Sequence, residues 1–249
     1  GSAAKFVAQA FVGDDLDNQS LPGVKINVVM GRHAGFLTAA SVLGRRPGTD
    51  DGPHLVYVPE AAFDADKFVA DVARVSDRIG RCVVAVSEGI HDKDGTPMAA
   101  KLAEMQGHRV ERDAHGNVQL SGSGALADFL GQAVKDYMGR RTRVRADTFG
   151  YLQRSYAGIA SEVDQREARL AGRKAAELAT SGIKHGSIAI QRVPGDDYQV
   201  EYNRIELADV AAKTKHLPEE WIENGNNIGQ GFIDYALPLV GELPVVERV

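Results

Sequence analysis

Continuous apolar runs predict the buried strands of this chain. Each run is short, rich in β-branched residues and apolar at successive positions, which is typical of strands covered on both faces of a parallel sheet. The segments with this pattern are residues 24–29, 54–58, 81–86 and 187–190.

Apolar residues three or four positions apart predict amphipathic helices. The segments with this spacing are residues 64–80, 126–139 and 161–182. Asp64 and Ser161 are favourable N-caps, and each segment ends at a glycine, which terminates helices readily. Because strand and helix patterns alternate, the sequence predicts an α/β fold with a doubly wound, mostly parallel sheet.

Polar segments interrupt this alternation. Residues 109–120 and 188–202 each predict a hairpin, because strand-like residues flank a turn-forming sequence. Residues 44–53, rich in glycine, proline and aspartate, predict an exposed loop, and the carboxylates of residues 13–16 are expected in another. No linker is long enough to separate two independent domains, so two lobes would be joined by short connections.

Composition narrows the class of protein. A chain of 249 residues, 43% of them hydrophobic, suffices for one large α/β domain or two smaller ones. The net charge of −5 argues against a general nucleic-acid surface, and no apolar run approaches the roughly 18 residues of a membrane span. The single cysteine cannot form an internal disulfide. We therefore expect a cytoplasmic protein that acts on small molecules, without nucleic-acid or membrane partners.

A candidate binding site follows the first predicted strand at Met30, Gly31 and Arg32. In open α/β sheets ligands bind where strands end and helix N-termini begin. Gly31 allows close backbone approach to a ligand, and the Arg32 guanidinium can bind oxygen-rich groups. The pattern favours an anion or sugar-phosphate site. A tight turn with a solvated arginine explains it as well, so both interpretations stay open.

A second candidate site follows the third predicted strand at Glu88 and Gly89. The carboxylate can accept hydrogen bonds from sugar hydroxyls, and Gly89 leaves room beside it. A carboxylate that faces solvent at a strand end is the alternative. The Ser-Gly-Ser-Gly segment at residues 121–124 can cradle an anion or simply begin a helix.

A third candidate site lies between residues 140 and 154, where arginines are frequent. Arg145, Tyr151 and Arg154 flank a strand-like turn, and planar guanidinium groups suit a phosphate. A solvated charged surface is the alternative. Zinc-type Cys/His spacing, a G-x-S-x-G elbow and a Walker A sequence are absent from the chain, and Cys82 in its apolar strand is expected to be an inert core residue.

The combined motifs resemble the phosphofructokinase family, most closely its pyrophosphate-dependent branch. The matching segments are GSAAKFVA at residues 1–8, MGRHAGFL at 30–37, SEG at 87–89 and GYLQR at 150–154. Their order and spacing agree with the family across most of the chain. The resemblance implies a phosphofructokinase-like fold, with one complete lobe plus part of a second.

The resemblance also implies a pocket for fructose 6-phosphate. Its residues would be Met30, Gly31, Arg32, Glu88, Arg145, Tyr151 and Arg154. In the family's chemistry, Arg32 would neutralise charge on the transferred phosphoryl group, Glu88 would accept sugar hydroxyls, and the last three residues would hold the 6-phosphate. One pocket arginine in the family often comes from a neighbouring subunit, so Arg145 is expected to act across a homo-oligomer, a dimer or a tetramer.

Two family segments do not occur in these 249 residues. They are the donor-binding Gly-Gly-Asp and the Thr-Ile-Asp-Asn-Asp stretch that carries the catalytic base. The resemblance therefore implies the C-terminal part of such an enzyme, inactive by itself. Residues 1–154 would form the sugar-phosphate lobe, residues 155–192 would return to a donor-binding lobe, and residues 193–249 would be a hairpin and helices that pack back on the first lobe.

The expected activity is that of a glycolytic 6-phosphofructokinase. With Mg²⁺, it would transfer a phosphoryl group from pyrophosphate or ATP to the 1-hydroxyl of fructose 6-phosphate. A non-catalytic sugar-phosphate sensor or regulatory subunit with the same fold is the main alternative, because fold does not dictate function. An unrelated doubly wound domain whose turns imitate the motifs is a third possibility.

Overall fold

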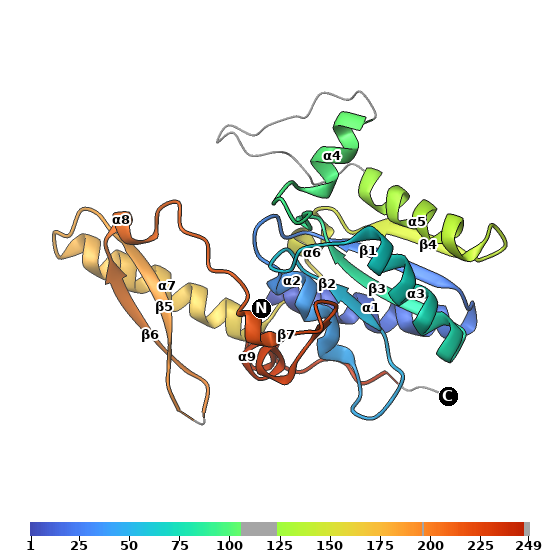
Figure 1. Cartoon of the computed structure of the whole chain (residues 1–249). Coiled ribbons are helices and arrows are strands. Elements are labelled where there is room, and N and C mark those ends of the chain that lie inside the picture. The colour runs from blue at the N-terminus through green and yellow to red at the C-terminus, as the bar shows by residue number, and fades with distance from the viewer. Residues whose placement is uncertain (106–123, 196, 247–249) are drawn as a thin grey trace.

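A parallel sheet forms the centre of the larger of two bodies (Figure 1). The computed structural model describes residues 1–105, 124–195 and 197–246. The sheet has four strands in the order β2-β3-β1-β4, and each neighbouring pair is parallel. The strands are β1 (Val24–Val29), β2 (Leu55–Tyr57), β3 (Cys82–Ser87) and β4 (Val144–Thr148). The predicted fold class is confirmed.

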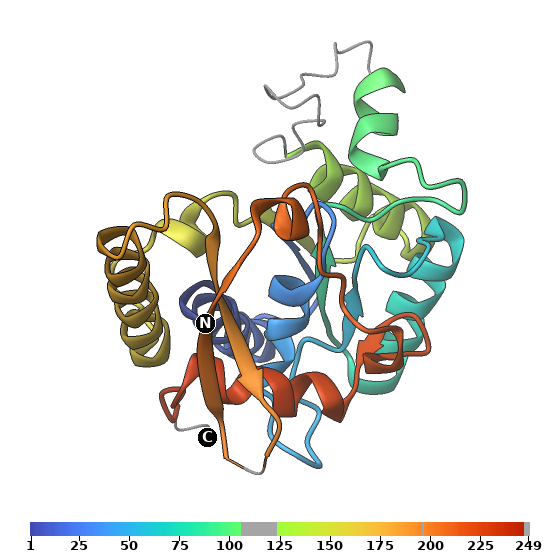
Figure 2. The same ribbon diagram turned by 90° about the vertical axis from the view of Figure 1, so that its left-hand side faces the viewer.

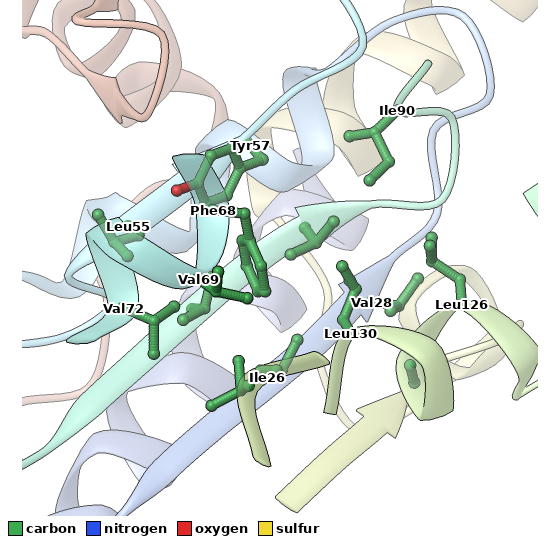
Figure 3. Close-up of a cluster of buried hydrophobic side chains, with 14 of the residues drawn as sticks. Ile26, Val28, Leu55, Tyr57, Phe68, Val69, Val72, Ile90, Leu126 and Leu130 are labelled. Atoms are coloured by element: carbon green, nitrogen blue, oxygen red, sulfur yellow. The ribbon is translucent and has the colours of Figure 1, made fainter. Parts of the chain in front are cut away.

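Helices cover both faces of this sheet, as a doubly wound fold requires. One face packs against α3 (Ala65–Ile79), α4 (Met98–Met105) and α5 (Ala125–Met138). The other packs against α1 (Ser2–Ser20), α2 (Phe36–Ala39), the 3₁₀ helix η1 (Ala40–Gly44) and α9 (Gln230–Val240). Figure 3 shows the first of these cores, where Phe68 of α3 and Leu130 of α5 meet the buried side chain of Ile26 in β1.

Helix α3 begins and ends at the capping residues that the sequence predicts. The Asp64 carboxylate accepts hydrogen bonds from the backbone N–H groups of Asp66 and Lys67, which caps the helix. Gly80 ends it in the left-handed conformation, with φ of 78°. Phe68 and Val72 are fully buried. The capping residues Asp64 and Gly80 therefore set the two ends of α3, and its apolar stripe sets the face that is buried.

A second, smaller body stands beside the sheet (Figures 1 and 2). Helix α7 (Glu162–Thr180) packs on an antiparallel hairpin of β5 (Ser187–Val193) and β6 (Gln199–Ile205). The hydroxyl of Ser161 accepts the N–H of Asp164 and caps α7, as predicted. The chain then returns to the sheet body through α8 (Leu207–Val210), the 3₁₀ helix η2 (Glu219–Trp221) and the short strands β7 (Ile222–Glu223) and β8 (Asn227–Ile228).

The hairpin corrects one strand prediction and confirms another. Residues 187–190 were expected in the parallel sheet, which is wrong, because β5 pairs antiparallel with β6. The hairpin predicted over residues 188–202 is confirmed. Residues 109–120 lie outside the described part of the chain, as does most of the 121–124 segment. In the described ranges, no helix combines the length and the apolar character of a membrane span.

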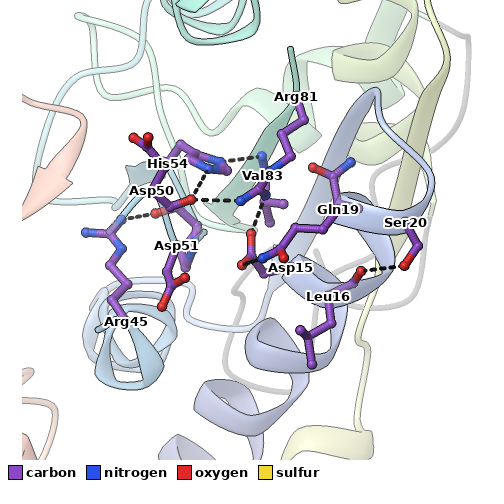
Figure 4. A network of polar contacts seen from close by, with 12 residues as sticks. Asp15, Leu16, Gln19, Ser20, Arg45, Asp50, Asp51, His54, Arg81 and Val83 are labelled. Carbon is purple, nitrogen blue, oxygen red and sulfur yellow. Dashed lines mark hydrogen bonds and ion pairs between the residues drawn. The ribbon is translucent and has the colours of Figure 1, made fainter. Parts of the chain in front are cut away.

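The loop prediction for residues 13–16 is wrong, and the predicted loop of residues 44–53 is more buried than expected (Figure 4). Residues 13–16 belong to α1, and Asp15 is fully buried where it forms an ion pair with Arg81. The loop of residues 44–53 is exposed only in part, because Asp51 is buried and accepts hydrogen bonds from Arg46. Asp15 and Asp51 therefore serve buried polar contacts, which the general preference of aspartate for loops does not reveal.

Candidate functional site

The predicted motifs converge at one edge of the sheet, where the parallel strands end. The register pairs Val29 of β1 with Ser87 of β3, and Val28 with Thr148 of β4. The residues that follow these strands therefore emerge side by side. They are Met30-Gly31-Arg32 after β1, Glu88-Gly89 after β3 and Phe149-Gly150-Tyr151 after β4.

Glu88 is directed back onto the loop that follows β1. Its Oε1 accepts a hydrogen bond from the Gly31 N–H at 3.2 Å, and its own N–H donates to the Val29 carbonyl at 2.8 Å. The Ser87 hydroxyl donates to the Gly31 carbonyl at 2.7 Å. Glu88 is only 6% exposed, so the interpretation of a solvent-facing carboxylate is wrong. These contacts fix the peptide that precedes Arg32.

Glycine is needed at two positions for this close approach. Gly31 has φ of 144°, and a Cβ there would lie 2.7 Å from the Ala34 carbonyl oxygen. A Cβ at Gly89 would lie 2.1 Å from the Arg32 carbonyl oxygen. The space at Gly89 is therefore filled by the backbone of Arg32, and not left open for a ligand as the sequence suggested. The two loops form one unit with half-buried Arg32 in it.

Tyr151 and Arg154 form a second part of the same edge. The Arg154 guanidinium lies 4.7 Å from the centre of the Tyr151 ring, and both side chains are exposed. Tyr151 is the N-cap residue of the short helix α6 (Leu152–Ser155), and Arg154 lies within that helix. Gln153 is 2% exposed, and its amide donates to the Gly150 carbonyl at 2.8 Å. The buried Gln153 side chain anchors this short helix, while the side chains of Tyr151 and Arg154 stay accessible to solvent.

Arg145 is not brought to this edge within the chain. It is the second residue of β4 and pairs in register with Lys25, near the beginning of β1. Gly150 comes five positions after Arg145, about 16 Å along an extended strand. Its exposed side chain lies near Asp17 and contributes to the lowered pKa of that carboxyl, which is caused mainly by a hydrogen bond from Lys25. A role for Arg145 in a partner's pocket stays a prediction.

Metal and thiol chemistry have little support in the described residues. Among them, no group of three or more His, Cys, Asp or Glu side chains could hold a metal ion. A ligand set for Mg²⁺ is therefore not found in this part of the chain. Cys82 is fully buried, and burial raises the pKa of its thiol to about 12. It is a core residue, as predicted, and not a nucleophile.

Sequence reasoning assigned no role to three residues that organise the site. Ser87 and Gln153 are buried polar residues that hold backbone carbonyls. Glu60 follows β2 and accepts the Gly35 N–H at 2.9 Å. The sequence could have indicated Glu60 as a site residue, because it is a carboxylate shortly after a buried strand, as Glu88 is. Ser87 and Gln153 lie in the matching segments 87–89 and 150–154, but no role was predicted for them, because their partners are backbone atoms that only the fold brings near.

Known proteins are similar to this chain in both sequence and structure. The family model for phosphofructokinase matches residues 1–179. Pyrophosphate–fructose 6-phosphate 1-phosphotransferase of Rhodospirillum rubrum is 58% identical over 241 residues, which cover 96% of this chain and 58% of that protein. The protein of the same name from Halomonas elongata is 35% identical over 246 residues, 96% of this chain and 55% of its own.

A solved structure matches the whole fold. The crystal structure of pyrophosphate-dependent phosphofructokinase from Marinobacter aquaeolei superposes with a TM-score of 0.78 at 28% identity, over 99% of this chain and 56% of that one. The chain thus spans a little over half the length of the relatives it matches. The family model, which matches well over half of the residues, shows that this chain belongs to the phosphofructokinase family.

Proposed function

We propose that this chain carries the fructose 6-phosphate side of a pyrophosphate-dependent phosphotransferase. The reaction would move a phosphoryl group from pyrophosphate to the 1-hydroxyl of the sugar, a step of glycolysis. The observation that carries the proposal is the contact between Glu88 and Gly31 beside Arg32, at the edge where ligands bind in this fold class. The printed names of the relatives at 58% and 35% identity support pyrophosphate over ATP as donor.

The loop after β1 would hold the reacting end of the sugar. Met30 and Gly31 contact the sugar in this proposal, and Glu88 accepts hydrogen bonds from its hydroxyls. Arg32 would stabilise the charge that develops on the transferred phosphoryl group. A cation that is already held in position is effective there, because the protein needs little structural rearrangement to reach the transition state. The hydrogen bonds at Gly31 supply that fixation.

Tyr151 and Arg154 would hold the 6-phosphate. Their exposed side chains offer a phenol and a guanidinium, which suit phosphate oxygens, and the buried Gln153 keeps them in place. Arg145 would complete the phosphate site of a neighbouring subunit, because its own strand carries it about 16 Å from Gly150. We therefore also propose a homo-oligomer, a dimer or a tetramer.

The smaller body would contact a donor-binding lobe. Apolar side chains on and beside its hairpin support this proposal, since Ile190 is 44% exposed and Ile183 is 39% exposed. In the proposed division, residues 155–192 return to that lobe and residues 193–249 pack back on the sugar-phosphate lobe of residues 1–154. The hairpin itself begins at Ser187, so it spans the proposed boundary. Mg²⁺ is proposed for the reaction, and a cytoplasmic location for the protein.

The direct test is product formation with each donor. The natural full-length gene product is mixed with fructose 6-phosphate, Mg²⁺ and either pyrophosphate or ATP, and fructose 1,6-bisphosphate and released phosphate are measured. We expect product with pyrophosphate and little with ATP. Binding of fructose 6-phosphate without turnover on either donor would favour the sensor alternative. Absence of both binding and turnover would contradict the proposal.

A further inference from the structure

Glu60 lies at the same edge of the sheet as the proposed site. It follows β2 by three residues, and β2 runs parallel to β3, whose end carries Glu88. Both oxygens of the Glu60 carboxylate accept the Gly35 N–H, Oε1 at 2.9 Å and Oε2 at 3.2 Å. Gly35 is the N-cap residue of α2, where an N–H has no partner inside the helix.

The loop of residues 31–35 is therefore held at both of its ends. Glu88 and Ser87 hold Gly31 at the first end, and Glu60 holds Gly35 at the second. Arg32 lies between these anchors. A loop fixed at one end only would let its middle residues shift, and displacement of a reacting group by 1 Å can cost about a hundredfold in rate.

The glycine at position 35 is explained by its close packing against the end of β2, at Val58 and Glu60. Its backbone angles, φ of −85° and ψ of 7°, are accessible to any residue. A Cβ at this position, however, would lie 2.6 Å from the Val58 Cβ and 2.7 Å from the Glu60 Oε2. Space, and not conformation, requires glycine here, because the loop packs closely against the Val58 side chain beside the Glu60 carboxylate.

The same carboxylate holds a second, distant segment. The Leu217 N–H donates to the Glu60 Oε1 at 2.8 Å, across 157 positions of sequence. Leu217 is 2% exposed, whereas residues 211–216, which return from the hairpin, are exposed. Glu60 thus fastens the returning chain and the loop of Arg32 to one point at the end of β2.

We infer that Glu60 is a positioning residue for the proposed phosphoryl transfer. Its carboxylate fixes the loop of residues 31–35 through the Gly35 N–H, and thereby sets where the Arg32 guanidinium stands. Glu60 touches no reacting atom in this account. The inference rests on the proposed function, because it assigns a role within that reaction.

Substitutions at Glu60 separate positioning from simple stability. We expect Glu60→Ala to lower kcat by about ten- to a hundredfold, with a much smaller change in the KM for fructose 6-phosphate. Glu60→Gln keeps an oxygen that can accept both N–H groups, so it should restore most of kcat. Glu60→Asp keeps the charge but withdraws the oxygens by one methylene, so it should resemble Glu60→Ala. Glu220→Ala, at an exposed carboxylate of η2, is the matched control.

If the wild-type protein forms fructose 1,6-bisphosphate, each outcome with the variants decides the inference. Wild-type kcat in Glu60→Ala would overturn it, and so would a Glu60→Gln variant as slow as Glu60→Ala. Should Glu60→Ala fail to fold in circular dichroism, the comparison of Glu60→Asp with Glu60→Gln decides in the same way. A wild-type protein that forms no fructose 1,6-bisphosphate would instead refute the proposed function, so the two failures are distinguishable.

Discussion

Backbone atoms, more than side chains, shape this site at the scale of single residues. Gly89 packs against the Arg32 carbonyl, and the Gly31 peptide is bonded on both sides, to Glu88 and to Ser87. Motifs rich in glycine are read easily in a sequence as places for a ligand. Here Gly89 makes room for the neighbouring loop of residues 31–35, and that loop carries the Arg32 guanidinium, which is proposed to act on the phosphoryl group.

Replacing Gly89 by alanine tests this contact. The added Cβ would meet the Arg32 carbonyl at 2.1 Å, and backbone on both sides leaves no flexible side chain to move. We expect Gly89→Ala to lower the free energy of unfolding by about 1–3 kcal/mol and to weaken fructose 6-phosphate binding. Chemical denaturation and ligand titration measure the two effects.

Gly172→Ala is the matched control for that experiment. Gly172 lies in α7, is exposed, and has open space where a Cβ would stand. Alanine there should leave binding unchanged and stabilise the helix by roughly 0.5–1 kcal/mol. Binding by Gly89→Ala that equals binding by wild type would contradict the tight packing of the two loops.

At the scale of elements, burial on both faces decides what a sequence reveals. Strands β1 and β3 are buried at nearly every position, so their apolar runs predict them well. Strand β4 is an outermost strand of the sheet and pairs only with β1 among the described strands. Its residues alternate between half-buried and exposed, and Arg145 is one of the exposed ones. Its charges obscured the strand, and for that reason the distance of Arg145 from the site was not predicted.

Polar contacts between elements are also hidden from sequence reasoning. Asp15 of α1 and Arg81 before β3 are 66 positions apart, and only the fold makes them a buried pair. His54 joins the same network by accepting the Val83 N–H through its Nδ1 at 2.8 Å (Figure 4). Burial, assisted by the charge of Arg81, lowers the pKa of His54 below its usual 6.5.

The lowered pKa of His54 predicts a loss of stability in weak acid. Below pH 6.5 the unfolded chain takes up a proton at His54 while the folded protein resists it, so the free energy of unfolding falls as pH falls. One such group contributes at most about 1.4 kcal/mol per pH unit. Asp71 and Asp164, with pKa values lowered from 3.8, lose their contributions at lower pH and do not obscure this window.

Urea denaturation between pH 7.5 and 5.5 measures this effect. The His54→Gln variant retains a hydrogen-bond acceptor for the Val83 N–H but cannot be protonated in this range. Its stability should depend on pH less steeply than that of the wild type. Equal slopes for the two proteins would show that His54 does not resist protonation in the folded state.

At the scale of the whole molecule, the site is a property of strand order. Three motifs that are far apart in sequence meet because β3, β1 and β4 are parallel neighbours, so their ends share one edge. Motif order and spacing predicted this much, together with the fold class and the family. The anchoring by Glu60 and the separation of Arg145 depend on loop contacts and strand register, which a single sequence does not disclose.

The central claim is that this edge binds fructose 6-phosphate, and calorimetric titration of the protein with that sugar tests it most directly. Wild type, Arg154→Ala and the control Arg169→Ala, at an exposed residue of α7, are compared. We expect Arg154→Ala to weaken binding by about ten- to a hundredfold, because a charge-assisted contact contributes roughly 1.5–3 kcal/mol, while Arg169→Ala binds like wild type. Equal affinity of wild type and Arg154→Ala would contradict the account.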